Sequence, residues 1–136
     1  MLGSKQSTML IADLWAEYRG LFEFLDMEQL GVNTPGCFGN YPINLACVRG
    51  NVEEVMLLLT EGADINQRGE YGSTPLCDAV GAGHTHIVRL LVARGANVHL
   101  KDEMGYSPKD RALLKPNERG EMIIILSKAE KLAPPN

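Results

Sequence analysis

Cysteine is scarce in this sequence, which has only Cys37, Cys47 and Cys77 among its 136 residues. The number is odd and no pair has the spacing Cys-x-x-Cys, so the pattern indicates neither a disulfide framework nor a zinc site. Reduced thiols are typical of proteins that stay in the cytosol. We therefore predict a chain that binds no metal and needs no cofactor.

Long apolar runs are also missing. No segment approaches the length of a membrane span, and no basic segment followed by an apolar run stands at the N-terminus. The lack of both features predicts a cytoplasmic protein that makes no membrane contact.

Basic residues are outnumbered, with 13 Lys and Arg against 17 Asp and Glu and a formal net charge of −4. Nucleic acids and anionic membranes are bound through clustered Lys and Arg. The charge therefore argues against both as partners, and a basic protein would suit this chain better.

No catalytic constellation is evident, and no phosphate-binding glycine loop or kinase signature occurs. His84 and His86 are two residues apart, so on one helix they should point to different faces and share no metal ion. His99 is expected in a loop. Cys77 stands beside Asp78 but has no evident base, so it is expected to be a buried spacer. An enzyme that uses Cys77 or the histidines is the competing hypothesis, and a Cys77 pKa near its ordinary value of ~8.5 would count against it.

What the sequence does have is a repeat. Glycines stand at positions 39, 72 and 105, and both 72 − 39 and 105 − 72 are 33. Prolines at 42, 75 and 108 and alanines at 46, 79 and 112 keep the same step. Several kinds of residue held at one period indicate an internal repeat rather than chance.

Each repeat is predicted to be two short antiparallel helices. Thr74 can cap a helix that begins at Pro75, since the fixed φ of proline suits the first helical position. Gly83 breaks this helix, and Gly95 ends the next one where a left-handed cap is expected. The second helix carries a stripe of apolar residues, Ile87, Val88, Leu90 and Leu91. Neither helix could bury its apolar stripe alone, so the units must stack.

These landmarks resemble the ankyrin repeat family. The resemblance rests on Gly72-x-Thr74-Pro75-Leu76, Ala79, Gly83-His84, Ile87-Val88, Leu90-Leu91 and Gly95-Ala96, in register over roughly residues 37–126. It implies an all-α solenoid of stacked antiparallel helix pairs with projecting β-turn or hairpin loops. It also implies that the protein recognises a partner protein and is not an enzyme.

The chain departs from the family pattern in places. The usual histidine after Thr-Pro-Leu is replaced by Asn44, Cys77 and Asp110, and Tyr41 takes the place of the first threonine. We expect these changes to remove some hydrogen bonds between neighbouring repeats and to lower the stability of the stack.

The predicted organisation is one domain, residues 1–136, of four stacked helix pairs. Thr8 could cap a first helix over 9–18, and a second is expected over 21–27. The proposed units are an N-terminal cap (1–36), two repeats (37–69 and 70–102), a C-terminal cap (103–130) with a longer loop at 115–119, and a tail (131–136) that is expected to be disordered from residue 132.

The first helices of such a stack line a concave face. Residues three and four apart share a helix face, so equivalent positions form rows across the repeats. The middle row, Asp78, Gly81 and Ala82, carries little side chain and should leave a dent. The neighbouring groups are Leu45, Val48 and Arg49 on one side and Arg111, Leu114 and Lys115 on the other, and we expect Arg49, Arg111 and Lys115 around the dent. Alternatively, Asp78 only neutralises Arg111 of the next repeat.

The projecting loops supply the second part of the predicted site. They place Cys37, Phe38 and Asn40, then Glu70, Tyr71 and Ser73, then Glu103, Met104 and Tyr106 in three neighbouring loops. Aromatic residues and methionine are enriched at protein interfaces, although loop aromatics can also fold back on their own repeat.

The sequence thus predicts a non-enzymatic module that binds another protein through its concave face and loops, as an inhibitor, adaptor or immunity-type protein. The free chain is expected to be a monomer. A homo-oligomer joined through the loop aromatics is the remaining alternative.

Overall fold

A computed structural model describes residues 10–25, 27 and 29–135. Over these residues the chain forms helices and no strands, which confirms the all-α prediction. The elements are α1 (Ile11–Arg19), the 3-10 turn η2 (Phe22–Phe24), α2 (Pro42–Arg49), α3 (Val52–Thr60), the 3-10 turn η3 (Glu70–Gly72), α4 (Pro75–Ala82), α5 (Thr85–Ala93), α6 (Pro108–Leu113) and α7 (Gly120–Leu132).

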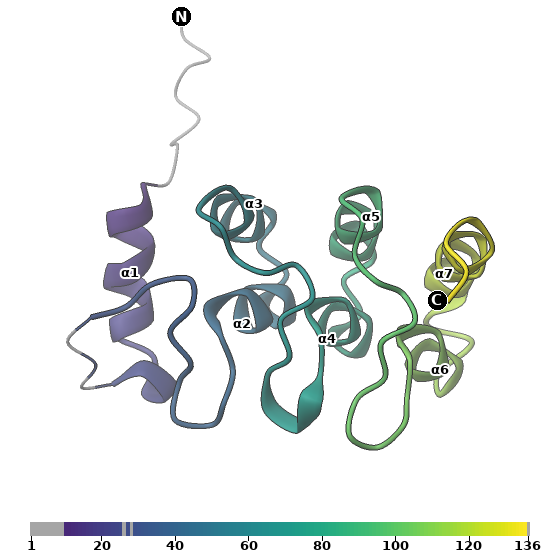
Figure 1. The fold of residues 1–136 in the computed structure, drawn as a ribbon, viewed down its shortest axis with the longest axis horizontal. Coiled ribbons are helices and arrows are strands. Elements are labelled where there is room, and N and C mark those ends of the chain that lie inside the picture. The colour runs from purple at the N-terminus through teal and green to yellow at the C-terminus, as the bar shows by residue number, and fades with distance from the viewer. Residues whose placement is uncertain (1–9, 26, 28, 136) are drawn as a thin grey trace, which may run out of the picture.

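The helices lie in two layers. Figure 1 shows α2, α4 and α6 side by side in one layer and α3, α5 and α7 in the other. One continuous core runs between them, from Leu14 and Phe24 near α1 to Met122 and Leu126 on α7. Each helix pair therefore buries its apolar face only because its neighbour covers it.

Three loops project beyond the layer of α2, α4 and α6 (Figure 1). We call them the first finger (36–40), the second finger (69–73) and the third finger (102–106). Each is closed by a hydrogen bond from the N–H of its first residue to the carbonyl of its last, at 2.8, 2.9 and 2.9 Å. In each finger the fourth residue is a glycine with positive φ, at +91°, +69° and +86° for Gly39, Gly72 and Gly105. The repeated glycine is thus explained by the turn, since other residues rarely adopt this conformation.

Asn44 ties two repeats together, so the expected loss of hydrogen bonds is wrong at this position. The side chain is fully buried. Its Nδ2 donates to the carbonyl of Gln67 (2.9 Å), just before the second finger, and to Oδ2 of Asp78 (3.1 Å) in the next repeat. Its Oδ1 accepts from the N–H of Tyr41 (2.9 Å), where the usual capping threonine is missing. An amide has two donors and an acceptor, which lets it make all these bonds.

Both His84 and His86 reach back to the preceding repeat. The His84 ring bonds the carbonyl of Val48 (2.8 Å) and the His86 ring that of Gly50 (3.1 Å). The prediction that the two point to different faces is wrong, because His84 is the N-cap of α5 and has non-helical φ and ψ. Arg119 repeats the arrangement one unit later, with its Nε 2.9 Å from the carbonyl of Val80. The two imidazoles and the Arg119 guanidinium thus bond backbone carbonyls at helix C-termini, which have no partner within their own helix.

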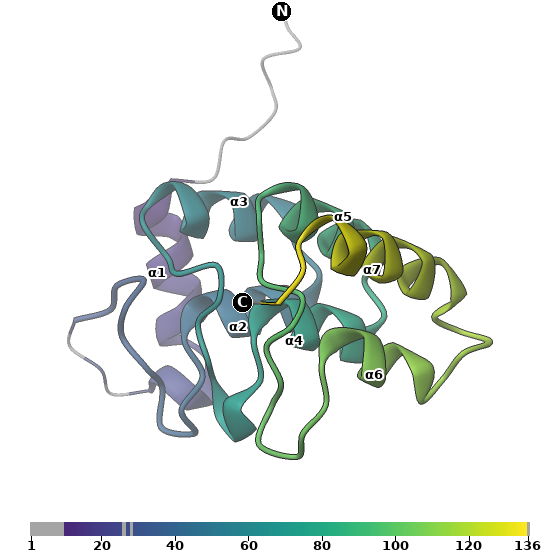
Figure 2. The ribbon, with the colours of Figure 1, turned by 45° about the vertical axis from the view of Figure 1, so that its right-hand side comes forward.

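The N-terminal cap differs from the prediction. Among the described residues of this cap, α1 is the only α-helix, and where a second helix is expected over 21–27 the chain forms the single turn η2. Glu23 explains this, because its Oε1 accepts from the N–H of Asn40 (2.9 Å) and its carbonyl from the N–H of Cys37 (2.9 Å). These bonds hold the segment against the first finger. In the described part of the chain, three helix pairs plus α1 replace the expected four pairs, and Figures 1 and 2 show α1 running across the end of the stack. Thr8 lies outside the described residues.

The C-terminal cap has the longer loop that the sequence predicts, since α6 ends at Leu113 and α7 begins at Gly120. The sequence predicts disorder from residue 132, but α7 includes Leu132 and the ring of His99 bonds the carbonyl of Ala133. The last turns of α7 consist largely of Ala, Glu, Lys and Leu, which are good helix formers. Asn136 lies outside the described residues.

Gly95→Val is expected to lower the free energy of unfolding by about 1 kcal/mol or more, because Gly95 has a φ of +86° that a β-branched residue rarely adopts. A Cβ at Gly95 would meet no atom within 4 Å, so the effect is one of backbone conformation alone. Gly120→Val is the matched control, since it is equally open without a positive φ. Urea unfolding of both variants would measure the difference, and equal stabilities would contradict the assignment.

Candidate functional site

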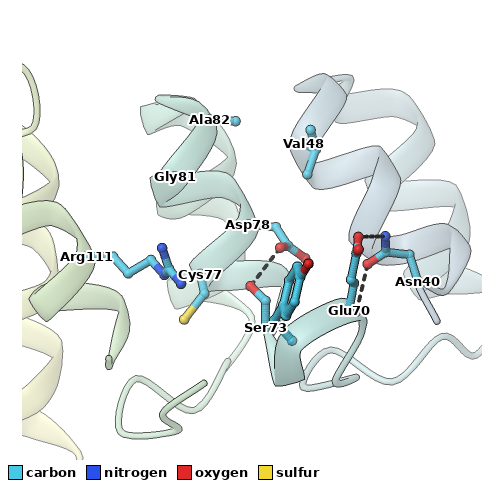
Figure 3. A pocket seen from close by; sticks show the side chains of 10 residues that line it. Asn40, Val48, Glu70, Ser73, Cys77, Asp78, Gly81, Ala82 and Arg111 are labelled. Carbon is cyan, nitrogen blue, oxygen red and sulfur yellow. Dashed lines mark hydrogen bonds between the residues drawn. The ribbon is translucent and has the colours of Figure 1, made fainter. Parts of the chain in front are cut away.

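A hollow of about 390 Å³ lies on the layer of first helices, between α2, α4 and α6 and beside the second finger. Figure 3 shows its side chains. It is lined by Asn40, Val48, Glu70, Tyr71, Ser73, Cys77, Asp78, Gly81, Ala82 and Arg111. All of these except Cys77 belong to the set of residues predicted to bind a partner. The dent expected at Asp78, Gly81 and Ala82 is therefore present as a surface feature, while its use in binding stays a prediction.

The floor of the hollow is the last turn of α4. A Cβ added at Gly81 would meet no atom within 4 Å, and Ala82 is exposed. Val48 on α2 forms an apolar wall with 46% of its surface exposed. A glycine inside a helix costs roughly 0.5–1 kcal/mol relative to alanine. Nothing in the surrounding packing requires Gly81, so its effect is to leave space.

Asp78 is one of two acidic residues that line the hollow, the other being Glu70. The Oδ1 of Asp78 accepts from Ser73 Oγ (2.7 Å) and its Oδ2 from Asn44 Nδ2 (3.1 Å). Burial raises the pKa of this carboxyl to about 6, although Ser73, Asn44 and the charge of Arg111 all act to lower it. Asp78 is therefore ionised at neutral pH at a cost in desolvation.

Arg111 is not paired with Asp78. Its Nε and one terminal nitrogen donate to Asp102 Oδ2, at 2.8 and 2.5 Å, and the guanidinium stands 5.4 Å from the ring centre of Tyr106. Burial acts to raise the pKa of Asp102, but the N–H of Tyr106 and the Arg111 guanidinium outweigh it, so this pKa is lowered. The alternative prediction, that Asp78 only neutralises Arg111, does not match the structure, because Arg111 hydrogen-bonds Asp102 instead.

The second finger presents Tyr71 at the edge of the hollow. Tyr71 is 67% exposed and has a φ of +57°, the only positive φ of a non-glycine residue in the described part of the chain. Such a conformation costs on the order of 1 kcal/mol for a residue with a Cβ. Its carbonyl accepts from the N–H of Glu103 (2.9 Å) in the third finger, and Glu70 next to it bonds Asn40. The three fingers thus support one another.

Six of the predicted residues lie outside the hollow. Arg49 points away from it, donating to Glu54 Oε1 (2.6 Å) on α3 and to Glu17 Oε2 (3.4 Å) on α1. Its expected place beside the dent is therefore wrong, because the buried Glu54 attracts it. Four more are exposed elsewhere: Phe38 on the first finger, Glu103 and Met104 on the third, and Lys115 in the loop after α6. Tyr106 does not line the hollow either but lies beneath Arg111.

Sequence reasoning missed two contributors. Cys77 lines the hollow beside Asp78, and Asn44 holds the Asp78 carboxylate from below. The replacement of the family histidine at position 44 was the available signal, since a polar residue at a buried position needs partners.

The environment of Cys77 does not activate its thiol as a nucleophile. Burial raises the pKa of its thiol, with the hydrogen bonds to Thr74 acting the other way, and a nucleophilic thiol needs a lowered pKa. Over the described residues, no group of three or more His, Cys, Asp and Glu side chains is placed to hold a metal ion. Within the same part of the chain, every helix is too short or too polar to cross a membrane.

A stack of helix pairs with a hollowed face and projecting fingers defines a repeat solenoid. Residues 10–102 match the family model for ankyrin repeats in three copies, and the chain belongs to the ankyrin repeat family. Proteins built from these repeats are generally protein–protein interaction modules and typically not enzymes. The match covers α1 to α5, and α6 and α7 form a further helix pair beyond it. A comparison with curated proteins returned no similar sequence.

Proposed function

We propose that this protein is a non-enzymatic module that binds one partner protein through the hollow and the second finger. It acts as an inhibitor, adaptor or immunity-type protein of the cytoplasm that covers a site on its partner. The free chain is a monomer, and its net charge of −4 suits a basic partner.

One observation carries this proposal. Three residues at the same hollow each oppose stability: Gly81 inside a helix, Asp78 as a partly buried carboxylate and Tyr71 in a left-handed conformation. Residues that break local rules together, without a packing reason, are typical of functional sites. Tyr71 and Val48 also expose apolar surface there, as interface anchors do.

Ala82→Arg is expected to weaken partner binding by at least ~2 kcal/mol, the scale of an interface hot spot, because a long side chain would fill the hollow. Folding should change little, since Ala82 is exposed on α4. Tyr71→Ala should weaken binding comparably, and Lys131→Ala, near the end of α7, is the control.

The unmodified chain and the three variants would each be used to pull down binding proteins from an extract of the native source. The partner recovered with the unmodified chain would then be titrated against each of the four. Circular dichroism would record the helix content. If Ala82→Arg retains its helices and binds like the unmodified chain, the partner uses another face. Sedimentation of the free chain would detect the alternative homo-oligomer.

A further inference from the structure

We propose that the hollow accepts a lysine side chain of the partner, whose ammonium group binds between the carboxylates of Asp78 and Glu70. This inference rests on the proposed function and specifies the chemistry of what enters the hollow.

The charges that line the hollow leave a negative excess. Among the described residues that line it, Asp78 and Glu70 are acidic and Arg111 alone is basic. The guanidinium of Arg111 donates twice to Asp102, whose side chain is fully buried, so its charge is already compensated. A cation brought by the partner would meet two carboxylates and no competing free cation among the lining residues.

The two carboxylates are held in place before any cation arrives. Asp78 is fixed by Ser73 and Asn44, and Glu70 accepts from Asn40 Nδ2 at 3.3 Å. Figure 3 shows the Asp78 side chain next to Ser73 and the Glu70 side chain next to Asn40, both on the side of the hollow away from Arg111. Preorganised acceptors lower the cost of ordering side chains on binding.

The shape of the site favours lysine over arginine. A bidentate guanidinium needs both oxygens of one carboxylate along an open edge. The two oxygens of Asp78 are each hydrogen-bonded, one to Ser73 and one to Asn44. A compact ammonium with three donors can instead use one remaining lone pair on each of two carboxylates.

The rest of the hollow suits the lysine stem. Gly81, Ala82 and Val48 offer an apolar floor and wall against which four methylene groups can pack. The ring of Tyr71 stands exposed at the rim and can cover the stem or face the ammonium.

Binding of such a cation should weaken as the pH falls through about 6, because Asp78 then takes up a proton. The charged groups that act on Asp78 are Glu70 from the second finger and Arg111 from α6. The thiols of Cys47 and Cys77, on α2 and α4, stay neutral because burial raises their pKa values. Lysine remains protonated throughout this range.

The test uses a displayed library of random short peptides selected on the unmodified full chain, with counter-selection on Ala82→Arg. Peptides that depend on the hollow should share a lysine at one position. Replacing this lysine by norleucine, which keeps the stem and removes the charge, should raise the Kd at least ~10-fold. On Asp78→Asn and on Glu70→Gln the same replacement should change the Kd less than ~3-fold.

The variants keep the local bonds. An asparagine at position 78 can accept from Asn44 and donate to Ser73, and a glutamine at position 70 still accepts from Asn40. Glu61→Gln is the matched control, since it removes one negative charge from an exposed site at the end of α3, and there the full lysine effect should remain.

Three outcomes would overturn the inference. Hollow-dependent peptides without a lysine, or with norleucine or arginine tolerated equally well, contradict the ammonium site and leave the proposed function standing. An undiminished lysine effect on both Asp78→Asn and Glu70→Gln contradicts the two-carboxylate geometry. Peptides that all bind Ala82→Arg equally well contradict the hollow as a binding site, and with it both proposals.

Discussion

A chain that ends at Asp102 is expected to lose its cooperative unfolding transition and to aggregate. Removal of residues 103–136 takes away α6 and α7, which cover one side of α4 and α5. The removed segment supplies Ala112, Met122 and Leu126, all buried in the common core. Burial of a large apolar side chain contributes roughly 1.5–3 kcal/mol, and a whole domain is stable by only about 5–15 kcal/mol. The remaining chain should therefore retain little net stability.

The deletion also removes Arg119, whose bonds to the carbonyls of Val80 and Gly81 satisfy the end of α4. The control ends at Ala133, which keeps every helix and the contact of His99 with the Ala133 carbonyl. Thermal unfolding followed by circular dichroism would compare both with the full chain. A soluble 1–102 chain with a cooperative transition near that of the full chain would show that the last helix pair is not a required cap.

The period of 33 residues is why much of the fold could be predicted from the sequence. Glycines and prolines recur because the same left-handed turn and the same helix start recur, and these are local properties of the backbone. The N-terminal segment lacks these glycine and proline landmarks at the same step. Its conformation depends on distant partners: Glu23 on Asn40, and Tyr18 on the carbonyl of Pro42 (3.0 Å). Such contacts leave no periodic trace in the sequence.

The hollow itself was predictable because it comes from absent side chains, and equivalent positions on neighbouring helices form rows wherever the helices persist. The residues that surround the hollow were harder to predict. Lys115 does not continue the row of helix positions along the hollow, because α6 ends at Leu113. The Arg49 side chain donates a hydrogen bond to Glu54 and does not line the hollow. Glu54 takes a position in α3 where α5 has the apolar Ile87, so an acidic residue in the apolar stripe was the available signal for this pairing.

Asp78→Asn is expected to stabilise the protein at neutral pH. Burial raises the pKa of Asp78 from its ordinary value of 3.8 to about 6, so the ionised carboxylate opposes folding. One pKa unit corresponds to ~1.4 kcal/mol, which makes this cost on the order of 2 kcal/mol when solvent screening is allowed for. An amide has no charge to desolvate and keeps both hydrogen-bonding partners.

The pH dependence gives the sign of the effect. Between pH 3.8 and about 6 the folded chain holds the Asp78 proton more tightly than the unfolded chain. The contribution of Asp78 to stability therefore falls as the pH rises through this window. The advantage of Asp78→Asn should be near zero below it and complete above it. Other carboxyl groups, such as Glu54, titrate in both proteins and cancel in the difference.

Urea unfolding of both proteins at about pH 3.5 and pH 7.5 would measure this difference. The same substitution is expected to weaken binding of a lysine-bearing partner, so stability and affinity should change in opposite directions. A variant less stable than the unmodified chain at about pH 7.5 would mean that the carboxylate supports the fold, and the case for Asp78 as a binding group would lose its energetic basis.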